Sequence, residues 1–326
     1  MHTPLRAISV SVALLVSGCL GVDDGGGLDG GATNGVPNGI PGAGAGADAG
    51  GAGAGGGVSN GGSGVVGSCP AAPAGATADA VAALVATNTA RLAAGSPCAT
   101  MVAALNDGAV AHCAYYAANT GDCIANPHVE VDGCASFYAA NFDERERKAG
   151  YTGNPDSEDM HFVGDGAAAV QGWLDSIYHR YSIIDPWALD FGYGNTDNCD
   201  TMDFGGGAGG STPSSTIALY PYDGQTGVPT SFFGNESPEP PAPPAGWPSG
   251  YPISIFVQGE VTSAEIVRDG TADALPIEIV PKLSWQGNAV FFYTDTPLEA
   301  ATTYQVTVVG RNGADFTKVW RFTTSP

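Results

Sequence analysis

Hydrophobic residues recur at every third or fourth position through the first half of the folded sequence, which predicts amphipathic helices. The pattern covers four segments: 77–94, 100–119, 135–148 and 164–178. Turn-forming residues, Gly95-Ser96-Pro97 and Gly150, follow the first and the third segment, and such residues end helices. One later segment, 189–194, alternates instead and predicts a strand. Helices that come before strands predict an α+β domain.

The last third of the chain has short β-branched and aromatic runs with turn residues between them. The runs are 217–221, 253–257, 278–280, 289–293, 304–308 and 319–323. They predict an antiparallel all-β sandwich. The segments PYDGQTGVP at 221–229 and WRFTT at 320–324 resemble those of bacterial immunoglobulin-like domains. This resemblance implies a spacer or adhesive module without catalytic residues, and the alternative is carbohydrate binding through Trp247 or Trp285.

The N-terminus carries signals of export. Arg6 precedes an apolar run at 7–16 that suits a signal peptide and is too short for a membrane-spanning helix. The run ends in Val16-Ser17-Gly18-Cys19, which resembles a bacterial lipobox and implies cleavage before Cys19 and acylation of that residue. We therefore expect a lipoprotein signal peptide at 1–18 and a lipid bilayer as the partner of acylated Cys19. Because Leu20 rather than Asp follows Cys19, the expected location is the outer membrane and cell surface.

Two Gly-rich stretches divide the rest of the chain. Segment 19–68 has almost no large apolar side chains and predicts a disordered tether, because it cannot bury enough surface to offset the entropy of ordering. Segment 205–214 predicts a Gly/Ser linker. The expected domains are therefore 69–204 and 215–326, each long enough for a core of its own.

Six cysteines remain once Cys19 is set aside, and an even number in an exported chain predicts three disulfides. They are Cys69, Cys98, Cys113, Cys123, Cys134 and Cys199. Their pairing is open, although Cys113 and Cys123 flank a short loop and are a candidate pair. No C-x₂-C spacing points to a metal site instead. The formal net charge of −22 argues against nucleic acid as a partner.

Polar residues scattered through the first domain carry the candidate chemistry. They are Asn88, Arg91, His128, Arg147, Gly150, Tyr151, Glu158, Trp173, Ser176, His179 and Arg180. In this order the set resembles the CAP superfamily (cysteine-rich secretory, antigen 5 and pathogenesis-related 1 proteins) in its bacterial form. The resemblance implies a three-layer α-β-α sandwich with a cleft lined by His128, Glu158 and His179. It places Glu158 on an acidic loop and His128 on the loop after the second helix.

The sequence departs from the family pattern at its second carboxylate. Many members carry a second Glu three residues after the Trp, whereas Ser176 takes that position here, with Asp175 beside it as a candidate substitute. The acidic loop reads Ser157-Glu158-Asp159, where the bacterial pattern has Gly-Glu-Asn. The expected cleft residues are therefore His128, Glu158, His179, Asp175 and Ser176.

The two imidazoles of His128 and His179 suit Zn²⁺ or another divalent cation, with Glu158 as a ligand or as the base to a bound water. The same residues also have structural interpretations: a solvated loop His, one carboxylate of an acidic turn, and a cap at a helix C-terminus. His161 is a candidate third imidazole, and His112 is expected to be a packing or surface residue. Neither the H-E-x-x-H spacing of metalloproteases nor the G-x-S-x-G elbow of hydrolases occurs within the two expected domains, 69–204 and 215–326.

These observations favour non-catalytic binding of a small lipid or an extracellular macromolecule in the cleft, either directly or with the help of a bound metal ion. An enzyme is the less favoured class, because neither an activated nucleophile nor an oxyanion hole can be located in the sequence. A metal-dependent hydrolase of peptides or esters is the first alternative. A structural or adhesive envelope protein is the second.

Overall fold

The computed structural model describes residues 69–207, 211–283 and 286–326. The predicted signal peptide, the predicted acylation site Cys19, the predicted Gly-rich tether and Trp285 lie outside these residues. None of the helices in the described ranges has the length and apolar character needed to cross a bilayer.

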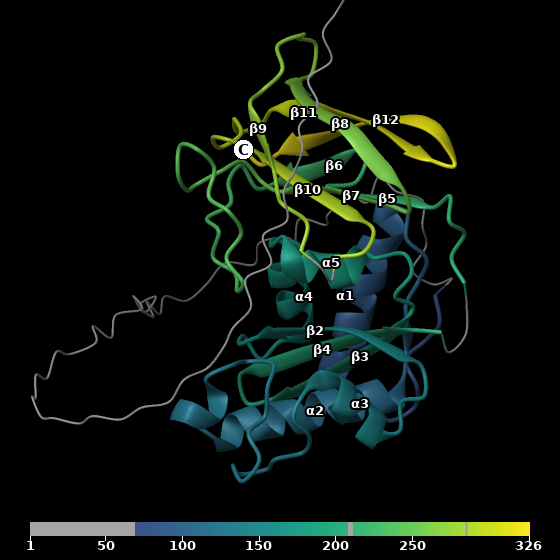
Figure 1. Cartoon of the computed structure of the whole chain (residues 1–326), viewed down its shortest axis with the longest axis vertical. Helices are drawn as coiled ribbons and strands as arrows, with labels where there is room; N and C mark the ends of the chain where they lie inside the picture. Colours follow the sequence, from purple (N-terminus) through teal and green to yellow (C-terminus); the bar gives the residue numbers. More distant parts are fainter. Residues whose placement is uncertain (1–68, 208–210, 284–285) are drawn as a thin grey trace, which may run out of the picture. The chain divides into compact units, whose positions relative to one another are not determined.

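The first module has a four-stranded sheet between two layers of helices (Figure 1). Its strands, in spatial order, are β1 (Thr100–Met101), β3 (Asp190–Thr196), β4 (Cys199–Gly206) and β2 (Asn154–His161). The helices of one face are α2 (Ala103–Ala118) and α3 (Phe142–Ala149), and those of the other are α1 (Ala78–Ala94), α4 (Gly166–Leu174) and α5 (Tyr178–Ile184). A 3₁₀ turn, η2 (Gly121–Ile124), follows α2. The predicted α+β class with an α-β-α sandwich is confirmed.

Local sequence explains where α1 and α3 begin and end. The Thr77 hydroxyl accepts the Ala80 N–H at the start of α1, and the Asn141 side chain accepts the Glu144 N–H at the start of α3. Gly95 and Gly150, at φ 95° and φ 97°, end these helices in the left-handed conformation that glycine adopts without steric cost. The predicted helix at 77–94 is therefore confirmed nearly to the residue.

Three predicted elements of the first module were wrong in extent. Segment 135–141 is a loop, because the Glu130 carboxylate and the Asn119 side chain take its N–H groups, so α3 starts only at Phe142. Residues 100–101 pair in parallel with β3 rather than starting the second helix. The predicted helix at 164–178 breaks after Leu174, and the unpredicted α5 follows.

The acidic segment Ser157-Glu158-Asp159 is the largest correction. It was expected to be a loop, but it forms the middle of strand β2, paired antiparallel with β4. Glu158 and Asp159 are buried there. Acidic residues disfavour strands, so partners elsewhere in the fold must compensate these two carboxyl groups.

The second module consists of two four-stranded sheets, and the predicted all-β sandwich is confirmed. One sheet has the order β5 (Ile217–Tyr220), β7 (Ile253–Val257), β10 (Ala289–Thr294) and β9 (Ile277–Ile279). The other has the order β6 (Gln225–Val228), β12 (Ala314–Thr324), β11 (Thr303–Asn312) and β8 (Glu260–Arg268). All six predicted runs fall on strands, whereas β6 and β8 were not predicted. Strand β6 pairs parallel with β12, so the sandwich is not purely antiparallel.

The three expected disulfides are present, and they settle the pairing that the sequence left open. They are Cys69–Cys98, Cys113–Cys199 and Cys123–Cys134. The candidate pair Cys113–Cys123 was wrong, because Cys113 lies on the buried side of α2 and faces the start of β4. The Cys113–Cys199 bond therefore ties α2 to the sheet.

One arginine joins the two modules. The buried Arg180 of α5 donates to the Leu174 carbonyl of the first module and to the Pro252 carbonyl of the second, both at 2.6 Å. Its guanidinium also lies 4.7 Å from the ring centre of Tyr220 and 4.9 Å from that of Tyr251. Such cation–π contacts are strongest when the cation is removed from water. The buried hydrophobic cluster likewise includes side chains of both modules.

Candidate functional site

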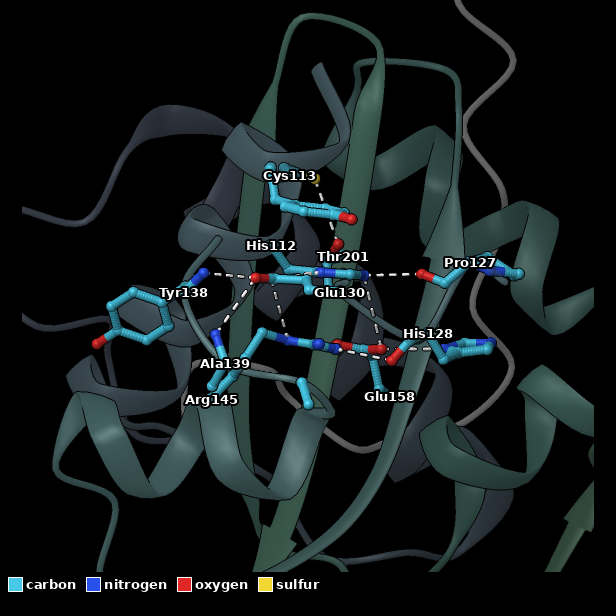
Figure 2. Close-up of polar contacts among 12 residues, drawn as sticks. His112, Cys113, Pro127, His128, Glu130, Tyr138, Ala139, Arg145, Glu158 and Thr201 are labelled. Carbon is cyan, nitrogen blue, oxygen red and sulfur yellow. Dashed lines mark hydrogen bonds and ion pairs between the residues drawn. The ribbon is translucent and has the colours of Figure 1, made fainter. Parts of the chain in front are cut away.

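Four charged side chains form a buried network between the sheet and the α2–α3 layer (Figure 2). His112 lies 2.9 Å through Nδ1 from Glu130 Oε1 and 2.8 Å through Nε2 from the Pro127 carbonyl. When Glu130 is ionised both partners are acceptors, and a ring that donates to both of them carries a proton on each nitrogen. Arg145 is the second cation, and Glu130 and Glu158 are the two anions. The expectation that His112 is a packing residue is thus met in part, since its charge also serves this network.

Glu158 connects the network to the groove described below. Its Oε2 accepts from Arg145 Nη2 at 2.5 Å, and its Oε1 lies 3.0 Å from His128 Nδ1. Burial raises the pKa of this carboxyl, but the hydrogen bond from His128 and the charge of Arg145 outweigh it and lower the pKa overall. Glu158 therefore stays ionised and holds the half-exposed ring of His128 in one orientation.

Two further carboxyl groups beside the network behave in the opposite way. Asp203 of β4 lies directly across from Glu158 in the strand register. Burial and the charges of Glu158 and Glu146 raise the pKa of Asp203 well above its ordinary value. Burial, then Glu158, then Asp143 raise the pKa of Glu146 to about 9. Glu146 is thus protonated near neutral pH, and the environment of Asp203 favours its neutral form.

These shifts predict that the folded chain is most stable in mild acid. Glu146 and Asp159, with pKa values of about 9 and about 7, bind protons more tightly when folded than when unfolded. The stability they contribute is complete below the unfolded carboxyl pKa and is lost as pH rises through those folded values. Glu158, whose pKa is lowered, contributes above its unfolded pKa and loses that contribution in stronger acid. We expect the unfolding temperature to peak near about pH 5 and to fall toward pH 9.

Differential scanning calorimetry across this pH range, on the unaltered chain and on Glu146→Gln, measures the effect. The variant should show a flatter decline between about pH 6 and pH 9, because its amide cannot ionise. A decline of unchanged steepness would show that Glu146 is not its source.

His179 is held by a carboxylate that comes from the second module. Its Nδ1 lies 3.3 Å from Glu236 Oε2 and 3.2 Å from Ser176 Oγ. Glu236 also accepts the backbone N–H groups of Ile177 and Tyr178, each at 2.8 Å. Burial lowers the pKa of His179, but Glu236 and the nearby Asp159 outweigh it and raise the pKa overall.

Replacing Glu236 with Gln should lower the pKa of His179, because the amide keeps the size of the side chain but removes its charge. The imidazole ¹⁵N shifts of His179, followed by NMR through a pH titration, measure this change. His128, whose ring is bonded to Glu158 instead, is the internal control, and its signals should be unaffected by the substitution. An unchanged titration of His179 would mean that Asp159 alone sets its charge.

Both imidazole–carboxylate pairs lie at one groove. A cavity of ≈ 470 Å³ is lined by His128, His161 and His179, by Asp175 and Ser176, and by Glu236 of the second module. Its apolar walls are Met160, Phe162, Trp173 and Phe232. The volume is in the range of small-molecule sites. The structure thus brings four of the five predicted cleft residues to one cavity, and His161 joins them as the third imidazole.

The fifth residue, Glu158, lines an adjoining cavity of ≈ 350 Å³. This second cavity shares His128, His179 and Ser237 with the first. Asp159, which the sequence analysis did not select, also lines it.

Asp175 contacts Tyr251 and Gln171 rather than an imidazole. Its carboxylate accepts from Tyr251 Oη at 2.7 Å and from Gln171 Nε2 at 3.1 Å, so it supports the junction of the two modules. The carboxylate that pairs with His179 is Glu236, which the sequence reasoning missed. Glu236 lies at the start of a Pro-rich segment, far along the sequence from His179. No motif or spacing in the sequence links the two residues.

Ser176, His179 and Glu236 do not form a hydrolytic triad. In a triad the serine and the carboxylate occupy opposite ring nitrogens, whereas here Ser176 and Glu236 both contact Nδ1. The Ser176 hydroxyl also donates to the Trp173 carbonyl at 2.8 Å. This serine is therefore a structural residue at the end of α4.

The fit of a metal ion is incomplete. His128 and His179 have the carboxylate at Nδ1 that metal-binding histidines commonly have. However, the described part of the chain holds no group of three or more His, Cys, Asp or Glu side chains arranged for a metal ion. Zn²⁺ takes three or four protein ligands, so two imidazoles alone fall short. Zinc at His128 and His179 stays a prediction, and no chemical step is derived from it.

Other residues of the CAP-like set have structural roles. Arg91 is buried and donates to the carbonyls of Pro97, Ile183 and Ala188, which fastens α1 to the end of α5. Asn88 exchanges two hydrogen bonds with the backbone of Ala99. These contacts position the sheet and helices behind the groove.

Comparison with known proteins gives only a distant likeness. No protein family matches the chain, and no curated protein matches it. Among solved structures it is similar to an extracellular protein containing an SCP domain from Bacillus anthracis strain Ames, at 21% identity and a TM-score of 0.35. That likeness covers 40% of this chain and 40% of the other. It is also similar to PcoC, a copper resistance protein from Escherichia coli, at 13% identity and a TM-score of 0.22, over 33% of this chain and 95% of PcoC. The description of the fold therefore rests on the elements themselves.

Proposed function

We propose that this chain is an exported binding protein with a CAP-type first module, and that it holds a small lipid or another extracellular molecule in the groove without converting it. The observation that carries the proposal is the pairing of His128 with Glu158 and of His179 with Glu236 at one groove with apolar walls. Such walls, with a few oriented polar groups, are typical of ligand sites.

Export is supported by the three disulfides, since such bonds persist in oxidising compartments. The lipobox-like segment adds the proposal that the mature chain is anchored to a bilayer through Cys19. Metabolic labelling with an alkyne fatty acid tests this: the label should appear on the unaltered chain and be lost from Cys19→Ser.

Binding is favoured over hydrolysis because Ser176, which contacts the His179 imidazole, meets the wrong ring nitrogen for a triad. Metal-dependent hydrolysis and a purely structural or adhesive role are the alternatives that the following experiment separates.

The test uses ¹⁵N-histidine-labelled chain with Cys19→Ser, titrated separately with palmitate and with ZnCl₂ while the imidazole signals are recorded. At least one probe should move the signals of His128 and His179. The signal of His112 should stay fixed, because both of its nitrogens are bonded inside the network. The hydrolysis of p-nitrophenyl butyrate, followed in parallel, should not exceed the rate in buffer.

Two outcomes would overturn the proposal. Ester hydrolysis that disappears in His179→Ala would assign the groove to a hydrolase. If no probe, including the peptide introduced below, shifts the imidazole signals of His128 and His179, the structural or adhesive role would be favoured.

A further inference from the structure

The groove follows an edge of the first sheet. Strand β2 is the last strand in the order β1-β3-β4-β2, so only one of its sides is paired. The two adjoining cavities are lined, between them, by every residue from Asp156 to Phe162. Because they share His128, His179 and Ser237, we treat them as one groove along β2. At ~3.3 Å per residue this stretch is roughly 20 Å long, which suits an extended occupant.

The backbone of β2 offers hydrogen bonds to such an occupant. The Met160 carbonyl accepts from Trp173 Nε1 at 3.0 Å and so points away from β4. Peptide groups of alternate residues in a strand point to the same side, so the N–H and C=O of Glu158 also point away from β4. In the described ranges no other strand pairs with this side of β2. A strand that enters the groove can therefore extend the sheet, as peptides do in β-augmentation.

Acidic side chains in the same groove favour a positively charged ligand. Asp159 is only 4% exposed, yet its Oδ2 has no hydrogen-bond partner, and the same holds for Ser157 Oγ. The exposed Asp156 stands two residues before Glu158 in the lining. Two imidazoles of the groove are already paired with carboxylates, His179 with Glu236 and His128 with Glu158. The Oδ2 atom of Asp159, which has no hydrogen-bond partner, therefore complements a basic side chain.

We propose that the groove binds an extended peptide segment that carries basic side chains, paired through its backbone with β2 at Glu158 and through a lysine or arginine with Asp159. This assignment rests on the proposed binding function and names the class of its ligand.

The test is fluorescence anisotropy with the full chain carrying Cys19→Ser and a labelled octapeptide of alternating Arg and Val. Three comparisons accompany it: the same peptide with N-methyl groups on alternate amides, a Glu-Val peptide, and two variants of the protein. Asp159→Asn removes the ionisable group of Asp159 from the groove, whereas Asp315→Asn removes a highly exposed charge on β12 and is the matched control. The Arg-Val peptide should bind, and Asp159→Asn should weaken it about tenfold or more through loss of a charge-assisted hydrogen bond, while Asp315→Asn leaves it unchanged.

N-methylation should abolish binding, because it removes the donors for β2 while it keeps the charge. Equal binding of the N-methylated peptide would overturn the proposal, since binding would then not need backbone pairing with β2. Equal binding of the Glu-Val peptide would also overturn it, since binding would then not depend on basic side chains. These peptide comparisons use a protein with unaltered groove residues, so they test the proposal even if the Asp159→Asn variant does not fold. If the Arg-Val peptide does not bind while palmitate or Zn²⁺ moves the groove imidazoles, the peptide assignment fails and the binding function stands.

Discussion

Replacement of Arg145 with Met should destabilise the folded chain by about 3–5 kcal/mol, the range for removal of one partner from a buried ion pair. Arg145 is 1% exposed and bonds Glu158 at 2.5 Å, with Glu130 at 3.8 Å. Its loss leaves two buried carboxylates with the His112 imidazolium as their only full countercharge within the network. Urea unfolding followed by circular dichroism measures the change.

Two comparisons sharpen this prediction. Arg311→Met removes an exposed arginine whose ion pair with Asp315 spans 3.9 Å, and it should cost less than about 1 kcal/mol. Arg145→Met made in a Glu158→Gln background should cost less than in the unaltered chain, because the nearer of the two carboxylates that lose Arg145 is then an uncharged amide. A cost for Arg145→Met as small as that of Arg311→Met would show that the network adds little to stability.

Removal of the Cys113–Cys199 disulfide by two Ser substitutions should destabilise the chain by about 2–5 kcal/mol. This bond closes a loop with a sequence separation of 86 and lies in the core, with Cys113 fully buried. The matched control is the Cys123–Cys134 disulfide, whose sequence separation is 11. The chain-entropy account predicts the larger loss for the longer loop.

Thermal unfolding of both double variants, under identical non-reducing conditions, tests this order. Equal losses for the two bonds would argue that loop length is not what sets their contribution. A smaller loss for Cys113–Cys199 would indicate that packing of α2 on the sheet holds without the bond.

The sequence predicted most reliably the elements whose pattern is local. The apolar runs of the second module all fall on strands, and Thr77 and Gly95 bound the first helix as capping residues should. Strand β2 escaped prediction because its residues, NPDSEDMH, disfavour strands and are held there by partners from other elements. The start of α3 was misplaced for a similar reason, since the Glu130 side chain binds the backbone ahead of it.

The candidate site divides in the same way. The resemblance to CAP proteins pointed to His128, Glu158 and His179, and the structure places all three along one groove. It could not supply Glu236, because that residue reaches His179 only through the docking of the second module. Asp159 was overlooked since its importance lies in a buried oxygen, Oδ2, that has no hydrogen-bond partner, which no sequence pattern records.

Arg180 has a consequence for how such a chain can change in evolution. Its guanidinium is enclosed by Tyr220 and Tyr251 and bonded to Pro252, all contributed by the second module. A descendant that lost this module would expose the arginine's apolar surroundings and at the same time leave His179 without its carboxylate. We therefore expect the two modules to be inherited as a pair, and a shortened relative to carry replacements at Arg180 and a new acidic residue near His179.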